Sequence, residues 1–235
     1  MRPTLRAPQA YIKWINSHLG FNPRSQANSN ALSNFVARDL KQSCPALRPD
    51  LLESHLRPQT NANVWTKVAE RNVDLVLHEE GVGPRISVRV AVEHKTIMTA
   101  HAKARWDRYG DIIAYSNHIH NHRRECIAGT IVVVNASAKY KNPDSFARGI
   151  QRPGFDMERV VKDTVKVFGD IPLRSDPAEP NDQPEAMAVV VLEYDGVSRA
   201  RLLRDAPAPL PGSTIHYDTF LTRICDLYVK RFSGR

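Results

Sequence analysis

The feature that most constrains the fold is a change in hydrophobic period at Val73. From this residue Val73, Leu75 and Leu77 alternate with other side chains, and residues 86–97 alternate in the same way. A period of two places successive side chains on opposite faces of a strand. Residues 79–84, Glu-Glu-Gly-Val-Gly-Pro, have the composition of a turn. The pattern therefore predicts an antiparallel hairpin.

The rest of the chain predicts helices around this hairpin. The spacing of apolar residues, or the position of prolines and other helix-end residues, predicts helices at 9–19, 29–42, 49–55, 61–70, 99–122, 156–168 and 217–232. Residues 127–134 are nearly all β-branched, which predicts a central strand buried on both faces. Residues 187–194 and 200–204 predict a second hairpin. The fold class is therefore α/β (α+β), with a central mixed sheet flanked by helices.

The charge and the cysteines predict the partner and the compartment. Lys and Arg number 33 and Asp and Glu 25, so the formal net charge is +8 and favours an anionic partner. The longest apolar run, 186–192, is far shorter than the roughly 20 residues that cross a bilayer. No membrane association or export is expected. Cys44, Cys126 and Cys225 form no Cys-x-x-Cys pair, which predicts reduced thiols in a cytoplasmic protein.

Two acidic residues of the first hairpin predict a metal site. If the hairpin folds symmetrically between Gly83 and Pro84, Asp74 and Glu93 lie opposite each other and share one face. Opposed like charges repel unless a cation lies between them. Mg²⁺ accepts one or two carboxylates and completes its shell with waters and phosphate oxygens. We therefore expect Asp74 and Glu93 to hold Mg²⁺.

Lys95 adds the chemistry of phosphodiester hydrolysis to this site. It lies two residues after Glu93, so on a strand both side chains point to the same face, while His94 faces the other side and is expected to be structural. Hydrolysis needs a deprotonated water and charge stabilisation at phosphorus. We expect Lys95 to orient or activate the water and to stabilise developing negative charge.

These residues resemble the motif of the PD-(D/E)xK nucleases, a family that includes many type II restriction endonucleases. Asn72-Val73-Asp74 stands where the family has Pro-Asp, without the proline, and Glu93-His94-Lys95 matches (D/E)xK. The resemblance covers about 40 residues. It implies a restriction-endonuclease-like core with a mixed sheet, Mg²⁺-dependent cleavage of DNA, and often a homodimer.

The resemblance also implies a further acid, because the family often has one on an upstream helix. Glu70, at the end of the helix predicted from Asn61, is the candidate for a third metal ligand, and Glu53 is its rival. A surface glutamate at a helix end is the alternative interpretation of Glu70.

The helix predicted at 99–122 follows the motif and is expected to contact DNA. Lys103, Arg105 and Arg108 lie on it and would bind phosphates, although arginines on a solvated face give the same pattern. Its apolar stripe is expected to pack on the sheet and consists of Ala102, Trp106, Tyr109 and Ile113. Its end carries His118, His120 and His122. No cysteine or obvious carboxylate adds to these histidines to complete a zinc site.

The sequence predicts one nuclease domain over 1–235. It comprises an N-terminal helical part at 1–60, a catalytic core at 61–135 and a C-terminal part at 136–235, whose acidic, proline-rich segment 170–186 is expected to be a solvated loop. The favoured function is that of a homodimeric type II restriction endonuclease that cuts double-stranded DNA, since two cuts call for two sites. A structure-directed or repair nuclease and a non-catalytic basic DNA-binding protein remain alternatives.

Overall fold

A computed structural model of the chain describes residues 5–20, 22, 25–53, 55–66, 69–79, 87–140 and 156–233. In these residues the helices are α1 (Ala7–Ser17), α2 (Gln26–Ser43), α3 (Leu47–Leu52), α4 (His101–His122), α5 (Met157–Gly169) and α6 (Tyr217–Phe232). The strands are β1 (Leu56–Trp65), β2 (Glu70–Glu79), β3 (Ser87–Ile97), β4 (Ile127–Asn135), β5 (Ala186–Glu193) and β6 (Arg201–Leu202).

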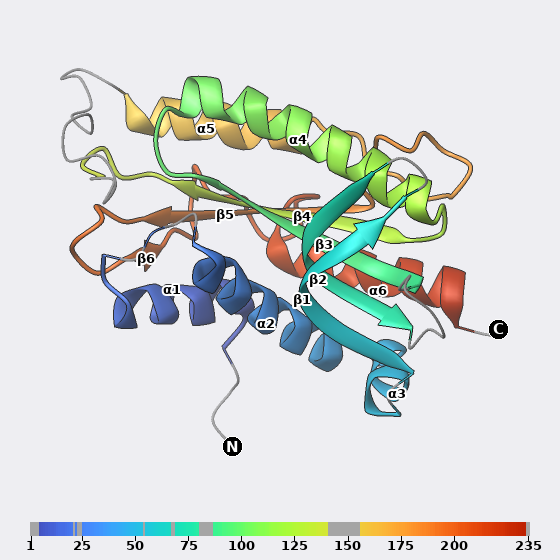
Figure 1. The fold of residues 1–235 in the computed structure, drawn as a ribbon. Coiled ribbons are helices and arrows are strands. Elements are labelled where there is room, and N and C mark those ends of the chain that lie inside the picture. Colours follow the sequence, from blue (N-terminus) through green and yellow to red (C-terminus); the bar gives the residue numbers. More distant parts are fainter. Residues whose placement is uncertain are drawn as a thin grey trace.

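The described strands form one mixed sheet in the order β1-β2-β3-β4-β5-β6 (Figure 1). The pairs β1–β2, β2–β3 and β5–β6 are antiparallel, whereas β3–β4 and β4–β5 are parallel. A parallel pair needs a long crossover, and the two crossovers here contain α4 and α5. The predicted α/β fold with a mixed sheet flanked by helices is confirmed at this level.

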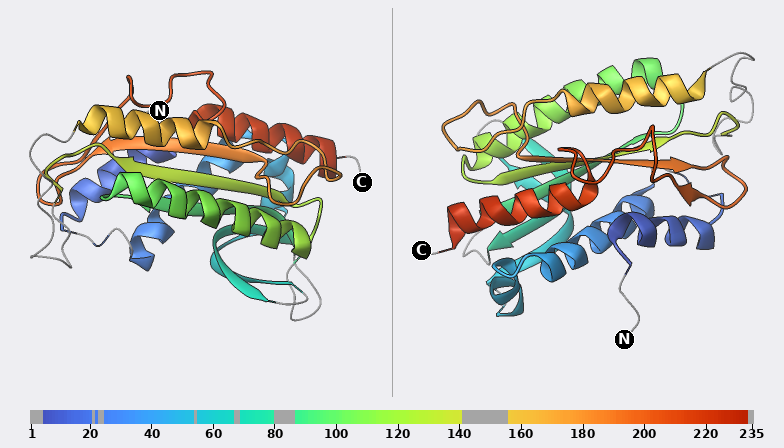
Figure 2. Two further views of the ribbon diagram at one scale, coloured as in Figure 1. Left: turned by 90° about the horizontal axis from the view of Figure 1, so that it is seen from above. Right: turned by 180° about the vertical axis from the view of Figure 1, so that it is seen from behind.

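Helices cover both faces of the sheet. Figures 1 and 2 show α4 and α5 over one face and α1, α2 and α6 over the other. The buried clusters follow the same division: Ile112 and Phe168 pack with Val132 on the first face, and Phe220 packs with Val92 on the second. The second cluster extends from α1 to α6, so elements from both ends of the chain share one core.

The predicted central strand is confirmed as β4. All nine of its residues are buried, and it lies between β3 and β5. Its Gly129 is required by the close approach of α6, because a Cβ at this position would lie 2.9 Å from a ring carbon of Phe220. Such a separation is shorter than carbon contacts allow, so any larger residue would push α6 away from the sheet.

The helix predicted at 61–70 is wrong. Residues up to Trp65 belong to β1, and β2 begins at Glu70. Ala62 and Val64 are buried under α4 while Asn63 between them is exposed, which is the alternation of a strand. The sheet therefore begins at Leu56, inside the part of the chain predicted to be helical.

The apolar stripe predicted for α4 is wrong except at Tyr109, which packs against the buried cluster of the sheet. Trp106, at the centre of that stripe, is 56% exposed. The helix instead buries Ile112, Tyr115 and Ile119, which repeat at intervals of three and four residues. Both sets of residues have helical spacing. The strands beneath the C-terminal half of α4 determine that Ile112, Tyr115 and Ile119 are the set that is buried.

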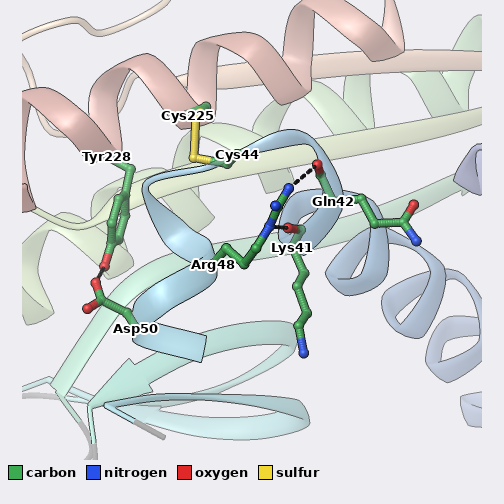
Figure 3. The surroundings of a disulfide bond; sticks show 7 residues. All are labelled: Lys41, Gln42, Cys44, Arg48, Asp50, Cys225 and Tyr228. Carbon is green, nitrogen blue, oxygen red and sulfur yellow. Dashed lines mark hydrogen bonds between the residues drawn. A yellow bond between two sulfur atoms is a disulfide. The ribbon is translucent and has the colours of Figure 1, made fainter. Parts of the chain in front are cut away.

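The cysteines differ from the prediction that all three are reduced. Cys44, at the C-terminal end of α2, forms a disulfide with Cys225 of α6, with 5.3 Å between their Cα atoms (Figure 3). Beside it, Tyr228 donates a hydrogen bond to Asp50 of α3. Cys126 is free, and burial raises its pKa. The thiol-based argument for a cytoplasmic location therefore loses its premise.

The segment 170–186 forms no helix or strand before β5 begins, as predicted. It is not wholly solvated, because Arg174 and Glu185 are completely buried. Arg174 Nη1 lies 3.3 Å from Glu185 Oε1, and Arg231 Nη1 of α6 lies 2.8 Å from the same oxygen. Opposite charges bury together far more readily than either does alone, so this segment is anchored to α6.

Candidate active site

The two strands that carry the motif pair as the sequence predicts. Leu75 lies opposite Val92, and Leu77 lies opposite Val90. Continuing this register by one position brings Asp74 level with Glu93. The register shifts between Leu77 and His78, toward the turn; residues 80–86, which contain most of the predicted turn, lie outside the described part of the chain.

The strand alternation breaks at Asp74, and this changes the direction of its side chain. Val73 packs under α4, whereas Leu75 packs with α1, α2 and α6, although residues two apart on a regular strand share a face. On β1, the register skips Asn61 opposite Asp74, and Asn61 adopts a left-handed backbone with φ of 51°. The expected picture of Asp74 and Glu93 side by side on one face is therefore corrected.

Asp74 is held between α2 and the motif strand. Its Oδ1 accepts a hydrogen bond from the hydroxyl of Ser29, and its main-chain oxygen accepts one from Ser33 Oγ at 3.0 Å. Its Oδ2 accepts a hydrogen bond of 2.7 Å from the backbone N–H of His94. His94 is the middle residue of Glu93-His94-Lys95. Asp74 is therefore hydrogen-bonded directly to the backbone of this motif.

Glu93 is buried between two cations. Its exposed fraction is 6%. Arg71 Nη2 lies 2.9 Å from Oε1 and 3.2 Å from Oε2, and Lys95 Nζ also donates to Oε1. A buried carboxylate needs such partners to remain ionised. The sequence identified Lys95 but gave no sign of Arg71. Arg71 lies two residues before Val73 and so shares the α4 face of β2. Its guanidinium carbon is 5.6 Å from the centre of the Tyr115 ring of α4.

Lys95 extends this set of charges onto α4. Its Nζ lies 3.8 Å from Asp111 Oδ2, and the same oxygen accepts a hydrogen bond of 2.6 Å from Arg108 Nη1. A cavity of about 210 Å³ adjoins these residues, and Asp74, Lys95, Arg108 and Ser29 are among the residues that line it. Of the predicted site residues, the structure thus brings Asp74, Lys95 and Arg108 to one cavity and places Glu93 against Lys95.

His94 faces α2, away from Lys95 and α4, as expected. Its Nδ1 is 3.5 Å from Ser33 Oγ. Burial lowers the pKa of His94 below its ordinary value of 6.5; Asp74 opposes this shift and Lys95 reinforces it. A neutral imidazole packed between β3 and α2 fits the structural role predicted for this residue.

The structure does not bring a third acid to the pair. Glu70 is the first residue of β2, exposed, and four positions before Asp74, a separation of about 13 Å along a strand. Its predicted place on an upstream helix is wrong. Glu53 is exposed and lies 3.7 Å from His55 at the end of α3. Among the described residues, no group of three or more His, Cys, Asp or Glu side chains is placed to hold a metal ion.

The helix that faces Asp74 carries hydroxyl groups in place of an acid. Ser29 and Ser33 are one turn apart on α2, and both contact Asp74. Sequence reasoning missed them, because a serine in a helix gives no signal of its own until the strand beneath is placed. We therefore leave Glu70 out of the site and add Ser29 and Arg71.

The basic residues of α4 occupy different surroundings. Lys103 is exposed. Arg105 lies 3.9 Å from Asp163 of α5, and Arg108 is paired with Asp111. Pairs of this kind are weak where water reaches them, so they do not prevent these side chains from binding phosphate.

The histidines at the end of α4 serve its attachment to neighbouring segments. His118 and His122 bond to the main-chain oxygens of Val64 and Trp65 at 3.0 and 2.7 Å. His120 Nε2 lies 2.8 Å from Glu185 Oε2. Each ring is engaged separately, so they form no shared metal site.

Comparisons with known proteins do not assign the chain to a family. No protein-family model matches the chain, and no curated protein matches its sequence. None of the helices in the described residues has the length and apolar character of a membrane span. The resemblance to the PD-(D/E)xK nucleases therefore rests on the motif residues of the sequence alone and stays a prediction.

Proposed function

We propose that the protein is a Mg²⁺-dependent endodeoxyribonuclease that hydrolyses phosphodiester bonds of DNA. One observation carries the proposal: Asp74 is hydrogen-bonded to the backbone of His94, between Glu93 and Lys95, on two neighbouring strands of the sheet. Asp74, Lys95 and Arg108 line one cavity, and Glu93 is paired with Lys95; together these side chains provide the groups that phosphodiester hydrolysis needs.

The residues present fit Mg²⁺. Asp74 and Glu93 offer hard carboxylate oxygens, and Mg²⁺ commonly uses one or two carboxylates together with waters and substrate phosphates. Both would hold the ion, Asp74 from the side of the His94 backbone N–H and Glu93 from the side of Lys95. A bound Mg²⁺ supplies charge stabilisation at the phosphorus centre and makes the attacking water easier to deprotonate.

The other side chains have assigned roles in the same reaction. Lys95 holds or orients the attacking water and stabilises the negative charge that develops on the phosphoryl oxygens. Ser29 and the backbone N–H of His94 fix the orientation of Asp74. Arg108, which lines the cavity, binds a phosphate of the substrate, and Lys103 and Arg105 extend this contact along α4.

The form of nuclease we propose is a type II restriction endonuclease that cuts double-stranded DNA as a homodimer. The net charge of +8 supports a polyanionic substrate. A structure-directed or repair nuclease would use the same catalytic residues on branched or damaged DNA. A non-catalytic DNA-binding protein would use Glu93 and Lys95 only as an ion pair.

Incubation of the protein with mixed plasmid DNA, with Mg²⁺ or with a chelator, tests the proposal. The wild type should cut only with Mg²⁺, and Asp74→Ala or Glu93→Ala should abolish cleavage while circular dichroism shows a folded protein, because either change leaves the cation underliganded. Glu193→Ala, which removes an exposed acid of β5, is the matched control and should cut normally.

The ends of the products separate the alternatives. A defined sequence at both ends indicates a restriction enzyme, and cuts that follow DNA structure indicate a structure-directed enzyme. Equal cleavage by wild type, Asp74→Ala and Glu93→Ala would refute the assigned site, and DNA binding without cleavage would leave the binding protein as the explanation.

A further inference from the structure

We infer that Arg71 is a built-in competitor of the metal ion at Glu93, and that DNA removes this competition by offering Arg71 a phosphate. Binding of Mg²⁺ and binding of DNA are thereby coupled. The inference rests on the proposed Mg²⁺ site and concerns its regulation by substrate.

The competition follows from the contacts of Glu93. One guanidinium nitrogen of Arg71 lies within 3.2 Å of both carboxylate oxygens, and Lys95 donates to one of them. A Mg²⁺ ion must approach such an oxygen to about 2.1 Å. Its charge then repels a guanidinium on the same carboxylate. Arg71 therefore has to leave Glu93, at least in part, when the ion binds.

The side chain of Arg71 can leave Glu93 toward solvent. Its side chain is 26% exposed, whereas that of Glu93 is 7% exposed, so the arginine reaches solvent and the glutamate scarcely does. A guanidinium has a planar set of donors that matches a phosphate as well as a carboxylate. Rotation of one side chain thus exchanges a carboxylate partner for a phosphate partner without moving the strand.

The charges of the site favour this exchange only when DNA is present. The site contains three carboxylates and three cationic side chains, which are Asp74, Glu93, Asp111, Arg71, Lys95 and Arg108. Their formal sum, −3 + 3, is zero. Mg²⁺ alone would raise it to +2 in a partly buried site, which is unfavourable, and two phosphates of DNA would restore neutrality.

The consequence is a reciprocal linkage. If DNA takes Arg71 away from Glu93 and thereby raises the affinity for Mg²⁺, then Mg²⁺ must raise the affinity for DNA by the same factor. The free protein would bind Mg²⁺ weakly and would assemble the complete site only on its substrate.

Calorimetric titration of Mg²⁺ into the full chain without DNA tests the inference. Arg71→Gln should bind Mg²⁺ about fivefold or more tightly than the wild type, the size expected for loss of an ion pair in which only the arginine reaches solvent. Arg71→Lys keeps the competing charge and should stay near the wild type. Arg201→Gln, which removes an exposed arginine paired with Glu193, is the matched control and should have no effect.

Cleavage at varied Mg²⁺ provides the second readout. With DNA bound, Arg71→Gln and the wild type should need the same Mg²⁺ concentration, while the maximal rate of Arg71→Gln falls because a phosphate contact is lost. Unchanged or weaker Mg²⁺ binding by folded Arg71→Gln without DNA would overturn the inference, as would an absence of detectable Mg²⁺ binding by both proteins. A wild type that binds Mg²⁺ but never cuts would instead refute the proposed nuclease function.

Discussion

Glu93 and Glu185 are both buried glutamates that contact two cationic side chains, and they differ in what else holds them. Glu185 is completely buried, as is its partner Arg174. Besides Arg174 and Arg231, it accepts a hydrogen bond of 2.8 Å from the backbone N–H of Ala128 at the start of β4. Displacing this carboxylate would therefore disrupt the strand, the anchored loop and α6 together.

Among the residues that the structure describes, no backbone N–H donates to the carboxylate of Glu93, which contacts only the side chains of Arg71 and Lys95. Its partners Arg71 and Lys95 are 26% and 15% exposed, and Lys95 lines a cavity. The side chains of Arg71 and Lys95 can rotate away from Glu93, whereas the backbone N–H of Ala128 cannot rotate away from Glu185. The comparison teaches that burial and ion pairing alone do not distinguish Glu185, a structural acid, from Glu93, the proposed catalytic one; the exposure of their partners does.

The largest effect should follow the loss of the structural acid. Glu185→Gln should lower the free energy of unfolding by about 3–5 kcal/mol, because Arg174 and Arg231 would remain buried without a counter-charge. Urea denaturation measures this loss. Glu193→Gln, in an exposed pair with Arg201, should cost at most about 1 kcal/mol. Equal losses in the two variants would break the comparison.

The next effect concerns the lysine beside Glu93. Lys95→Ala should leave DNA binding intact and lower the single-turnover cleavage rate by about 10² or more, the scale of one aimed catalytic group. Arg71 remains to neutralise Glu93, so the fold should persist. Cleavage at the wild-type rate would reduce Lys95 to an ion-pair partner.

The smallest effect tests the charged surface of α4. Affinity for DNA should fall steeply with salt, and Arg105→Ala or Arg108→Ala should each reduce the slope of log affinity against log salt by about 0.9, the value for one phosphate contact. Filter binding over a range of NaCl concentrations measures the slope. Arg201→Ala, distant on β6, serves as control; identical slopes in all four proteins would exclude this surface.

The sequence predicted the centre of the sheet well. The register of β2 with β3 followed from alternation about a turn, and β4 followed from its β-branched run, because buried strands leave little choice of residue. The bounds of α6 agreed with the predicted 217–232. Lys95 lies beside Glu93 as the alternation of β3 predicted, whereas the direction of Asp74 depends on the break in alternation and was not predicted.

The parts that failed depend on contacts distant in sequence. β1 was predicted as a helix in part because its outer side chains are polar, and only its pairing with β2 shows that Ala62 and Val64 alternate. Cys44 and Cys225 are 181 residues apart, and no local pattern indicates that α2 and α6 bring them together. The contact of Arg71 with Glu93 also depends on a break in alternation that the sequence does not reveal.

The most direct test of the central claim is a measurement of Mg²⁺-dependent nicking of supercoiled plasmid by the wild type, Glu93→Gln and Glu193→Gln at equal concentrations of folded protein. The substitutions are isosteric, and the partners of Glu93 reach solvent, so Glu93→Gln should stay folded. The account predicts nicking by the wild type and by Glu193→Gln and none by Glu93→Gln. Nicking by Glu93→Gln at the wild-type rate would contradict it.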